Sequence, residues 1–299
     1  MEAPSRAPFA EREAVIERLK TGPEKTGPDP LVEKTKATTT GPHAANRWTL
    51  RSLRRAFPEL SGYSPSGVWR AMRGLGLKLR SACVQQYSPD PEYTQKVRRL
   101  IRCLRAAARD PRRTIVLFLD EMGFCRWPEP APDWSAAAPA APPLADRRCS
   151  PNGLWRLVGA LDACSGRVLH ADGYIIGRKQ LIAFYGQIER AYPRAERIYV
   201  VQDNWSIHGH DDVLASLRQR PQITPVWLPT YAPWLNPIEK LWRWLKQDVL
   251  YMHRLADDWK ALHGSVLTFL NRFAHGSKTL RHYVGLLGHG QLATALNLN

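Results

Sequence analysis

The chain has 299 residues, a length that allows one large α/β domain together with a small additional one. Its 44% hydrophobic and 23% charged residues are typical of folded protein, so the composition excludes disorder of the whole chain. Lys and Arg number 43 against 27 Asp and Glu, which gives a formal net charge of +16 and favours a polyanionic partner such as nucleic acid.

The cysteines and the apolar runs narrow the class further. The five cysteines are widely spaced and form no CxxC pair, so neither a zinc ribbon nor a disulfide framework is indicated. No apolar run approaches the roughly 20 residues needed to span a bilayer, and the first residues lack the apolar core of a signal peptide. We therefore expect a protein of the cytoplasm.

Residues 1–46 predict a flexible tail with one short helix near residues 10–20. From residue 21 onward this segment is rich in Pro, Gly, Thr and Lys and has no apolar periodicity, so no fold is assigned to it.

Residues 47–87 predict two short helices joined by a tight turn. Apolar residues recur at helical spacing in the first helix, and Ser64 with Pro65 starts the second. The second helix carries arginines on its polar side and is followed by GLKLR, a possible short wing, so the segment resembles a helix-turn-helix or winged-helix DNA-binding module. A helical hairpin with a solvated basic face is the alternative. The candidate DNA contacts are Arg51, Arg54, Arg55, Arg70, Arg73, Lys78 and Arg80.

Residues 88–113 predict a basic linker helix that starts at Ser88 or Asp90. Its apolar residues form one stripe, and the basic residues lie outside that stripe. The alternative is an ordinary amphipathic helix docked on the following domain, and both descriptions can hold together. The basic residues are Lys96, Arg98, Arg99, Arg102 and Arg105.

Residues 114–255 predict an α/β domain with a mixed sheet. The apolar strand in RTIVLFLDEMGF is expected to end at Asp120 and Glu121, and two further strands flank a turn at Ser165 and Gly166. A helix, a strand, a helix, a strand and a helix follow, the last of them in NPIEKLWRWLKQDVL. Three hairpin-type strands followed by alternating elements are the order of the ribonuclease H-like fold, in which helices flank a mixed sheet.

Two other segments complete the plan of the chain. Residues 128–145 are rich in Pro and Ala and predict a long loop, and residues 256–299 predict a C-terminal helical extension.

Three carboxylates stand out in the predicted α/β domain. Asp120 and Asp203 each finish a strand, and Glu239 lies in the first turn of a helix that Asn236 can cap with Pro237 at its first position. For each residue alone, a turn, cap or helix-dipole role is as good an explanation. A carboxylate at the end of a buried strand is costly unless a cation or hydrogen-bond donors compensate. The three carboxylates together therefore predict a metal site.

The segments FLDEMGF, VQDNWSIH and LPTYAPWLNPIEKLW, in this order, resemble the three sequence blocks of the mariner superfamily of DDE transposases, in its bacterial insertion-sequence branch. The likeness runs from Trp48 to about residue 250. It implies that Asp120, Asp203 and Glu239 are the catalytic triad and bind two Mg²⁺ ions, for which Mn²⁺ can substitute. Carboxylate oxygens suit such hard ions.

The same resemblance implies the substrate and the setting of the reaction. It implies a protein that cuts double-stranded DNA at the terminal inverted repeats of a transposon and transfers the strands to target DNA by two-metal phosphoryl transfer. It also implies a homodimer on DNA and a nucleoid-associated location in a bacterial cytoplasm.

Three residues near the triad are weaker candidates. Glu121 should point away from Asp120 on an extended strand, as a structural group or a support for the metal ligands. Asn204 and His208 follow Asp203 closely enough to touch metal-bound water or phosphate, although a lone histidine is more often a polar loop residue.

The helix that carries Glu239 holds two further candidates for contact with DNA phosphate, Arg243 and Lys246. Trp242 and Trp244 on the same helix are expected to pack in the core and at its edge.

Two other functions remain compatible with these motifs. One is a catalytically inactive or truncated transposase relic that acts only as a DNA-binding protein. The other is a metal-dependent nuclease that hydrolyses DNA and never joins strands.

Overall fold

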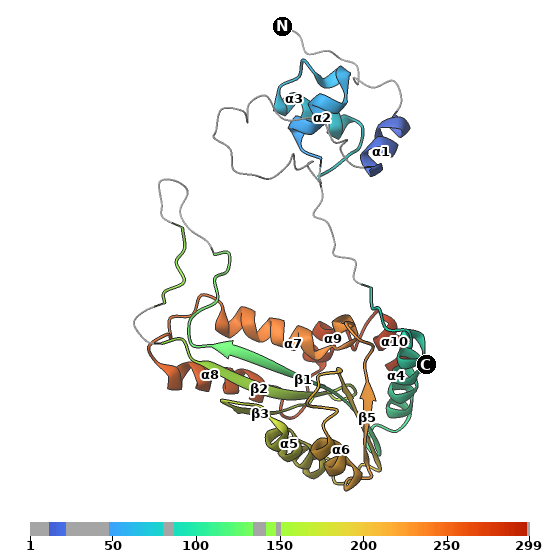
Figure 1. Cartoon of the computed structure of the whole chain (residues 1–299), viewed down its shortest axis with the longest axis vertical. Helices are drawn as coiled ribbons and strands as arrows, with labels where there is room; N and C mark the ends of the chain where they lie inside the picture. The colour runs from blue at the N-terminus through green and yellow to red at the C-terminus, as the bar shows by residue number, and fades with distance from the viewer. Residues whose placement is uncertain (1–11, 22–47, 80–86, 134–141, 148–150, 298–299) are drawn as a thin grey trace. The chain divides into compact units, whose positions relative to one another are not determined.

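The computed structural model describes residues 12–21, 48–79, 87–133, 142–147 and 151–297. The chain divides into two compact units, Met1–Val84 and Gln85–Asn299 (Figure 1). Of the predicted N-terminal tail, residues 1–46, the parts 1–11 and 22–46 lie outside the described residues, as does the candidate DNA contact Arg80. None of the described helices is long and apolar enough to cross a membrane.

The first unit is a small helical module. It contains α1 (Arg12–Thr21), α2 (Leu50–Ala56), the short 3₁₀ helix η1 (Pro58–Leu60) and α3 (Pro65–Gly74). As predicted, Ser64 caps α3: its hydroxyl accepts a hydrogen bond from the Gly67 N–H at 3.2 Å. The helices enclose one apolar core, made by Val15, Leu53, Phe57, Leu60, Val68, Met72 and Leu75.

The basic candidates of this module lie on its surface. Six of them are exposed, namely Arg51, Arg54, Arg55, Arg70, Arg73 and Lys78. The suggested wing is absent from the part of GLKLR that the structure describes, because the chain after α3 turns through Gly76 at a φ of 75° and forms no strand as far as Leu79.

The second unit is built on a five-stranded mixed sheet in the order β3-β2-β1-β4-β5. Its strands are β1 (Thr114–Cys125), β2 (Leu154–Asp162), β3 (Val168–Gly173), β4 (Arg197–Gln202) and β5 (Ile223–Trp227). β2 is antiparallel to β1 and to β3, whereas β4 is parallel to β1 and to β5. This topology confirms the predicted ribonuclease H-like fold class, in which three hairpin strands precede the alternating elements.

Helices cover both faces of the sheet (Figure 1). One face packs against α5 (Arg178–Ala191) and α6 (Asp211–Arg218). The other face packs against a set of helices that includes the last part of the chain. These helices are α4 (Tyr93–Arg109), α7 (Ile238–Leu245), α8 (Trp259–Asn271), α9 (Lys278–Val284) and α10 (Gln291–Leu296).

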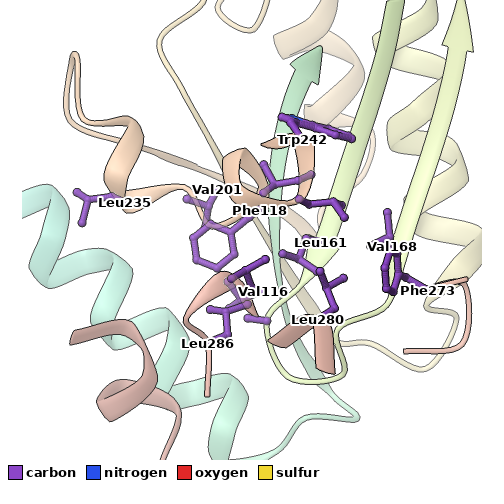
Figure 2. Packing of buried hydrophobic residues seen from close by; sticks show 14 of the residues in the cluster. Val116, Phe118, Leu161, Val168, Val201, Leu235, Trp242, Phe273, Leu280 and Leu286 are labelled. Atoms are coloured by element: carbon purple, nitrogen blue, oxygen red, sulfur yellow. The ribbon is translucent and has the colours of Figure 1, made fainter. Parts of the chain in front are cut away.

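The core on the α7 face joins the sheet to the C-terminal helices. Figure 2 shows Val116, Phe118 and Leu161 of the sheet packed with Trp242 of α7 and Leu280 of α9. Residues from the segments just before and just after α9 belong to the same cluster. Residues 256–297 thus supply part of the apolar core of the second unit. The boundary at residue 255 and the other predicted domain limits stay predictions.

Helix α4 begins later than the sequence indicated. The expected start at Ser88 or Asp90 is wrong, because α4 starts at Tyr93. The Asp90 carboxylate accepts hydrogen bonds from the Lys96 ammonium at 2.8 Å and from the Thr230 N–H at 2.8 Å, so it joins α4 to a distant loop. The apolar stripe of α4 packs in the core as expected, through Val97, Leu100, Cys103, Leu104 and Ala107. A linker role for this helix stays a prediction.

The loop predicted between β1 and β2 is closed at its root. The Arg126 N–H donates to the Gly153 carbonyl at 3.0 Å, and the Glu129 N–H donates to the Leu250 carbonyl at 3.1 Å. Leu250 ends η3 (Lys246–Leu250), the π-helical turn that follows α7. The described residues of this loop, 128–133 and 142–145, contain neither a helix nor an extended strand, in agreement with the prediction.

A glycine of β2 allows α7 to approach the sheet. A Cβ atom at Gly159 would lie 2.5 Å from Trp242 Cη2 and 3.2 Å from Ile238 Cδ1. Because Trp242 is buried, its ring has little room to move away.

We expect Gly159→Ala to destabilise the fold by about 1–3 kcal/mol, since overpacking forces buried side chains from their positions. Gly153→Ala is the matched control, because a Cβ atom there meets nothing within 4 Å. Urea unfolding of both variants measures the effect. Equal unfolding midpoints for the two variants would contradict this account of the packing.

Candidate active site

Strand β1 pairs unequally with its two neighbours. The expected strand end at Asp120 and Glu121 is wrong, because β1 continues to Cys125 alongside β2. On its other side, the parallel pairing with β4 reaches only from Thr114 to Phe118, which lies opposite Val201. Asp120 therefore lies two residues beyond the end of the parallel ladder, where the edge of β1 is no longer covered by β4.

The parallel register places two carboxylates at the same level. Asp203 follows Val201 by two residues, as Asp120 follows Phe118. Adjacent strands lie about 4.8 Å apart, and residues two positions apart face the same side of a sheet. Phe118 and Val201 both belong to the core under α7. Asp120 and Asp203, two residues further along each chain, therefore lie just beyond the carboxyl end of the β1–β4 ladder, on the α7 side of the sheet.

Helix α7 brings the third carboxylate to the same edge. Glu239 lies in the first turn of α7, as the sequence predicts. Two hydrogen bonds hold this end of the helix to β1: the Asn236 side-chain amide donates to the Leu119 carbonyl at 3.2 Å, and the Trp242 indole donates to Asp120 Oδ2 at 2.9 Å.

The predicted capping role of Asn236 is wrong. Pro237 occupies the N-cap position of α7 without any side-chain capping bond, and the Asn236 amide is used to reach β1 instead. Packing against the sheet thus takes precedence over a local cap. The contact of Trp242 with Asp120 was not predicted either. The sequence does place Glu239 and Trp242, which are three residues apart, on one face of the helix.

The three carboxylates are electrostatically coupled. Burial, followed by the negative charges of Glu239 and Glu121 and then that of Asp203, raises the pKa of Asp120 to about 8, although the Trp242 hydrogen bond opposes this shift. Burial and the charge of Asp203 also raise the pKa of Glu239, which Arg243 partly offsets. Arg243 therefore acts electrostatically on the carboxylate site.

A histidine joins the loop after β4 to β1. His208 is fully buried, and its Nε2 atom lies 3.0 Å from Glu121 Oε1. Its Nδ1 atom lies 3.7 Å from Asp203 Oδ1 and has no hydrogen-bond partner among the described residues. Glu121 and His208 thus connect β1 to the Asp203 loop beyond the point where the β1–β4 ladder ends.

The remaining candidates have structural contacts. The Asn204 side-chain amide donates to the Leu228 carbonyl at 3.0 Å and so ties the Asp203 loop to the segment after β5. Lys246 forms an ion pair with Glu129 at 3.2 Å, at the root of the loop between β1 and β2. Trp244 packs at the edge of the core against Phe269 and Phe273, in line with its expected role.

Comparison with known proteins identifies the family of the chain. Residues 115–263 match the family model described as DDE superfamily endonuclease. The chain belongs to the DDE superfamily. The matched residues contain Asp120, Asp203 and Glu239.

One curated relative of this DDE protein comes from a bacterial insertion element. It is 24% identical over 220 residues to the insertion element IS630 uncharacterized 39 kDa protein of Shigella sonnei. The alignment covers 73% of this chain and 62% of the relative, so the chain spans less than two thirds of that protein's length. The family model confirms the DDE family that the sequence resemblance implied, and the similarity to an insertion-element protein agrees with the insertion-sequence branch.

Solved structures support the fold. The Mos1 transposase paired-end complex with the left transposon end is similar with a TM-score of 0.60 and 15% identity, over 94% of this chain and 75% of that one. The Mos1 mariner paired-end complex with Mn has a TM-score of 0.54 and 16% identity, over 95% of this chain and 84% of that one. At these identities the likeness establishes the fold of the DDE protein.

The carboxylate oxygens of Asp120, Asp203 and Glu239 in the DDE protein are the type of ligand that a hard divalent cation prefers. In the described ranges, however, no group of three or more His, Cys, Asp and Glu side chains is already drawn together closely enough to hold a metal ion. Asp120 Oδ2 accepts the Trp242 indole N–H at 2.9 Å, and Asp203 Oδ1 accepts the Trp205 N–H at 3.0 Å. Each of these two carboxylates keeps its second oxygen out of these bonds. The pKa of Asp120 is raised first by burial and then by neighbouring negative charge, and a bound cation would offset both effects.

The pKa of Asp120 predicts how the stability of the metal-free protein depends on pH. The folded protein holds the Asp120 proton up to about pH 8, whereas an unfolded Asp releases it near its ordinary value of 3.8. Folded protein therefore binds more protons in this window, and its free energy of unfolding falls as the pH rises from about 4 to 8.

We expect Asp120→Asn to flatten this pH dependence and to be more stable than wild type above pH 8 in EDTA, with the difference closing toward pH 4. Asparagine keeps an oxygen that can accept the Trp242 N–H. Urea unfolding at a series of pH values measures both proteins. Curves that stay parallel across this range would contradict the environment assigned to Asp120.

Proposed function

We propose that this protein is a DNA transposase that cuts transposon ends at their terminal inverted repeats and transfers the strands to double-stranded target DNA. The observation that supports it most is the coupling of Asp120, Asp203 and Glu239 at one edge of a ribonuclease H-like sheet in a DDE-superfamily chain. The relative's name as an insertion-element protein and the Mos1 complexes with transposon ends support the same reading.

Two divalent cations would be held by Asp120, Asp203 and Glu239. These would be Mg²⁺ ions, for which Mn²⁺ can substitute. Such ions supply activation of water or a DNA 3′-hydroxyl and stabilisation of the leaving oxygen. The chain's own groups fix the ligands: the Trp242 indole orients the Asp120 carboxylate, and the Trp205 N–H orients the Asp203 carboxylate. Arg243 limits the charge repulsion at Glu239.

The small helical module would bind DNA through its exposed basic residues, and a second copy of the chain would complete a homodimer on DNA. Arg243 beside Glu239 is a candidate for phosphate contact near the reacting strand. A protein with this function would work at the bacterial nucleoid, in the cytoplasm.

We expect Asp203→Asn to keep DNA affinity and to lose DNA nicking by about 10³-fold or more, a loss of the size seen when a preorganised electrostatic group is removed. Asparagine is nearly isosteric but lacks the charge that holds a hard cation. Gel-shift affinity and Mg²⁺-dependent nicking are measured on the same DNA, which carries the element's flanking ends.

Asp211→Asn is the matched control, because Asp211 is an exposed carboxylate at the start of α6 and should leave nicking unchanged. Retained nicking in Asp203→Asn would remove Asp203 from the mechanism. DNA binding without nicking by wild type would favour the inactive relic, and nicking without strand joining would favour a plain nuclease.

Glu121 and His208 would act as positioning residues for Asp203. Their contact connects β1 to the Asp203 loop where no sheet hydrogen bonds are left to do so. Supporting partners of metal ligands typically change metal affinity by about 10- to 100-fold when they are removed.

We expect Glu121→Ala to raise the Mg²⁺ concentration for half-maximal nicking by about 10- to 100-fold, whereas Glu121→Gln, which keeps an acceptor oxygen, stays much closer to wild type. Adding His208→Ala to Glu121→Ala should bring little further loss, because both changes break one contact. Calorimetry of Mg²⁺ or Mn²⁺ binding gives a readout independent of nicking. Fully additive losses, or unchanged metal dependence, would rule out this role.

A further inference from the structure

The basic residues of α4 fall into two groups. This 17-residue helix contains Lys96 and five arginines but no acidic residue. Lys96 is paired with Asp90 at 2.8 Å, and the Arg99 guanidinium donates to the Pro225 carbonyl of β5 at 3.3 Å. These two cations are engaged by the fold. The other four, Arg98, Arg102, Arg105 and Arg109, are exposed and have no carboxylate or hydrogen-bond partner among the described residues.

These four arginines, named here the arginine stripe, lie on one line along the helix. Their successive spacings of four, three and four residues keep them on the same face of a helix with 3.6 residues per turn. The apolar residues of α4 occupy the opposite side and are buried in the core. From Arg98 to Arg109 the stripe extends about 16 Å at about 1.5 Å per residue, roughly the length of five base pairs at about 3.4 Å each.

The beginning of α4 is tied to the chain that leads into the carboxylate site. The Ser88 hydroxyl and the Asp90 carboxylate bond to the main chain of Thr230, in the segment between β5 and α7. Nearby, the Trp234 indole donates to the Tyr93 hydroxyl at 3.3 Å. The same segment continues to Glu239, so the stripe and the candidate active site belong to one packed unit.

We propose that the arginine stripe binds the phosphate backbone of duplex DNA on the same unit as the candidate active site, independently of the N-terminal helical module. The inference rests on the proposed function. Guanidinium groups bind phosphate oxygens well, and a line of them matches a regularly charged strand. A lipid surface fits less well, because membrane-binding helices place an apolar face in the lipid, whereas the apolar face of α4 is buried in protein.

The test compares two full-length variants with the same loss of charge. The stripe variant replaces Arg98, Arg102, Arg105 and Arg109 with Gln, which is favourable in helices. The control variant replaces four exposed basic residues on or beside the α5 and α6 side of the sheet, Lys179, Arg194, Arg197 and Arg218, with Gln. Fluorescence anisotropy measures the affinity for a DNA duplex of arbitrary sequence over a range of NaCl concentrations. The duplex has about 30 base pairs, which is longer than the ~5 base pairs that the stripe spans.

For the stripe variant we expect the slope of log affinity against log salt to become shallower by about 3 to 4, close to 0.9 for each lost phosphate contact. The control variant should change that slope by less than about 1. Replacing the same four arginines with Lys should largely restore the slope, which separates charge from folding defects, and circular dichroism melting checks all variants. Equal slopes for the stripe and control variants would overturn the proposal. Wild-type binding without salt dependence would overturn the proposed function as well.

Discussion

The unequal pairing of β1 is the constraint on which the site depends. Along β2 the strand is paired to its last residue, Cys125, but along β4 the ladder ends at Phe118. The chain thereby presents a well-anchored strand with one open edge. Asp120 is held in place because it pairs with β2, and it has no ladder partner on its β4 side. A strand unpaired on both sides would lack the first property, and one paired on both sides would lack the second.

Helix α7 turns this open edge into a charged site. The helix packs closely over β2 because Gly159 leaves room for Trp242, and the same tryptophan reaches Asp120. The Trp242 side chain thus both packs closely against β2 and orients the Asp120 carboxylate. This arrangement raises the pKa of Asp120, because burial and the neighbouring carboxylates disfavour its charged form. Sites of this kind store unfavourable electrostatics that a bound cation can relieve.

The sequence predicts local features well and misses those that depend on distant partners. The order of strands and helices, the cap at Ser64 and the position of Glu239 follow from nearby residues. The length of β1 could not be predicted from its own residues, because β2 extends it. The start of α4 was misplaced for a similar reason, since Asp90 bonds to Thr230, which is 140 residues away in the chain.

The closed root of the β1–β2 loop has a consequence for how this protein can vary. Main-chain hydrogen bonds from Arg126 to Gly153 and from Glu129 to Leu250 hold both sides of the loop base to the domain. The base of the loop is therefore held in place by bonds that do not depend on the length of the chain between its two sides. Doubling such a segment costs only about 0.6 kcal/mol in closure entropy. Insertions, deletions or a grafted reporter peptide should be tolerated there, so this loop is where related proteins can differ in length without losing the domain.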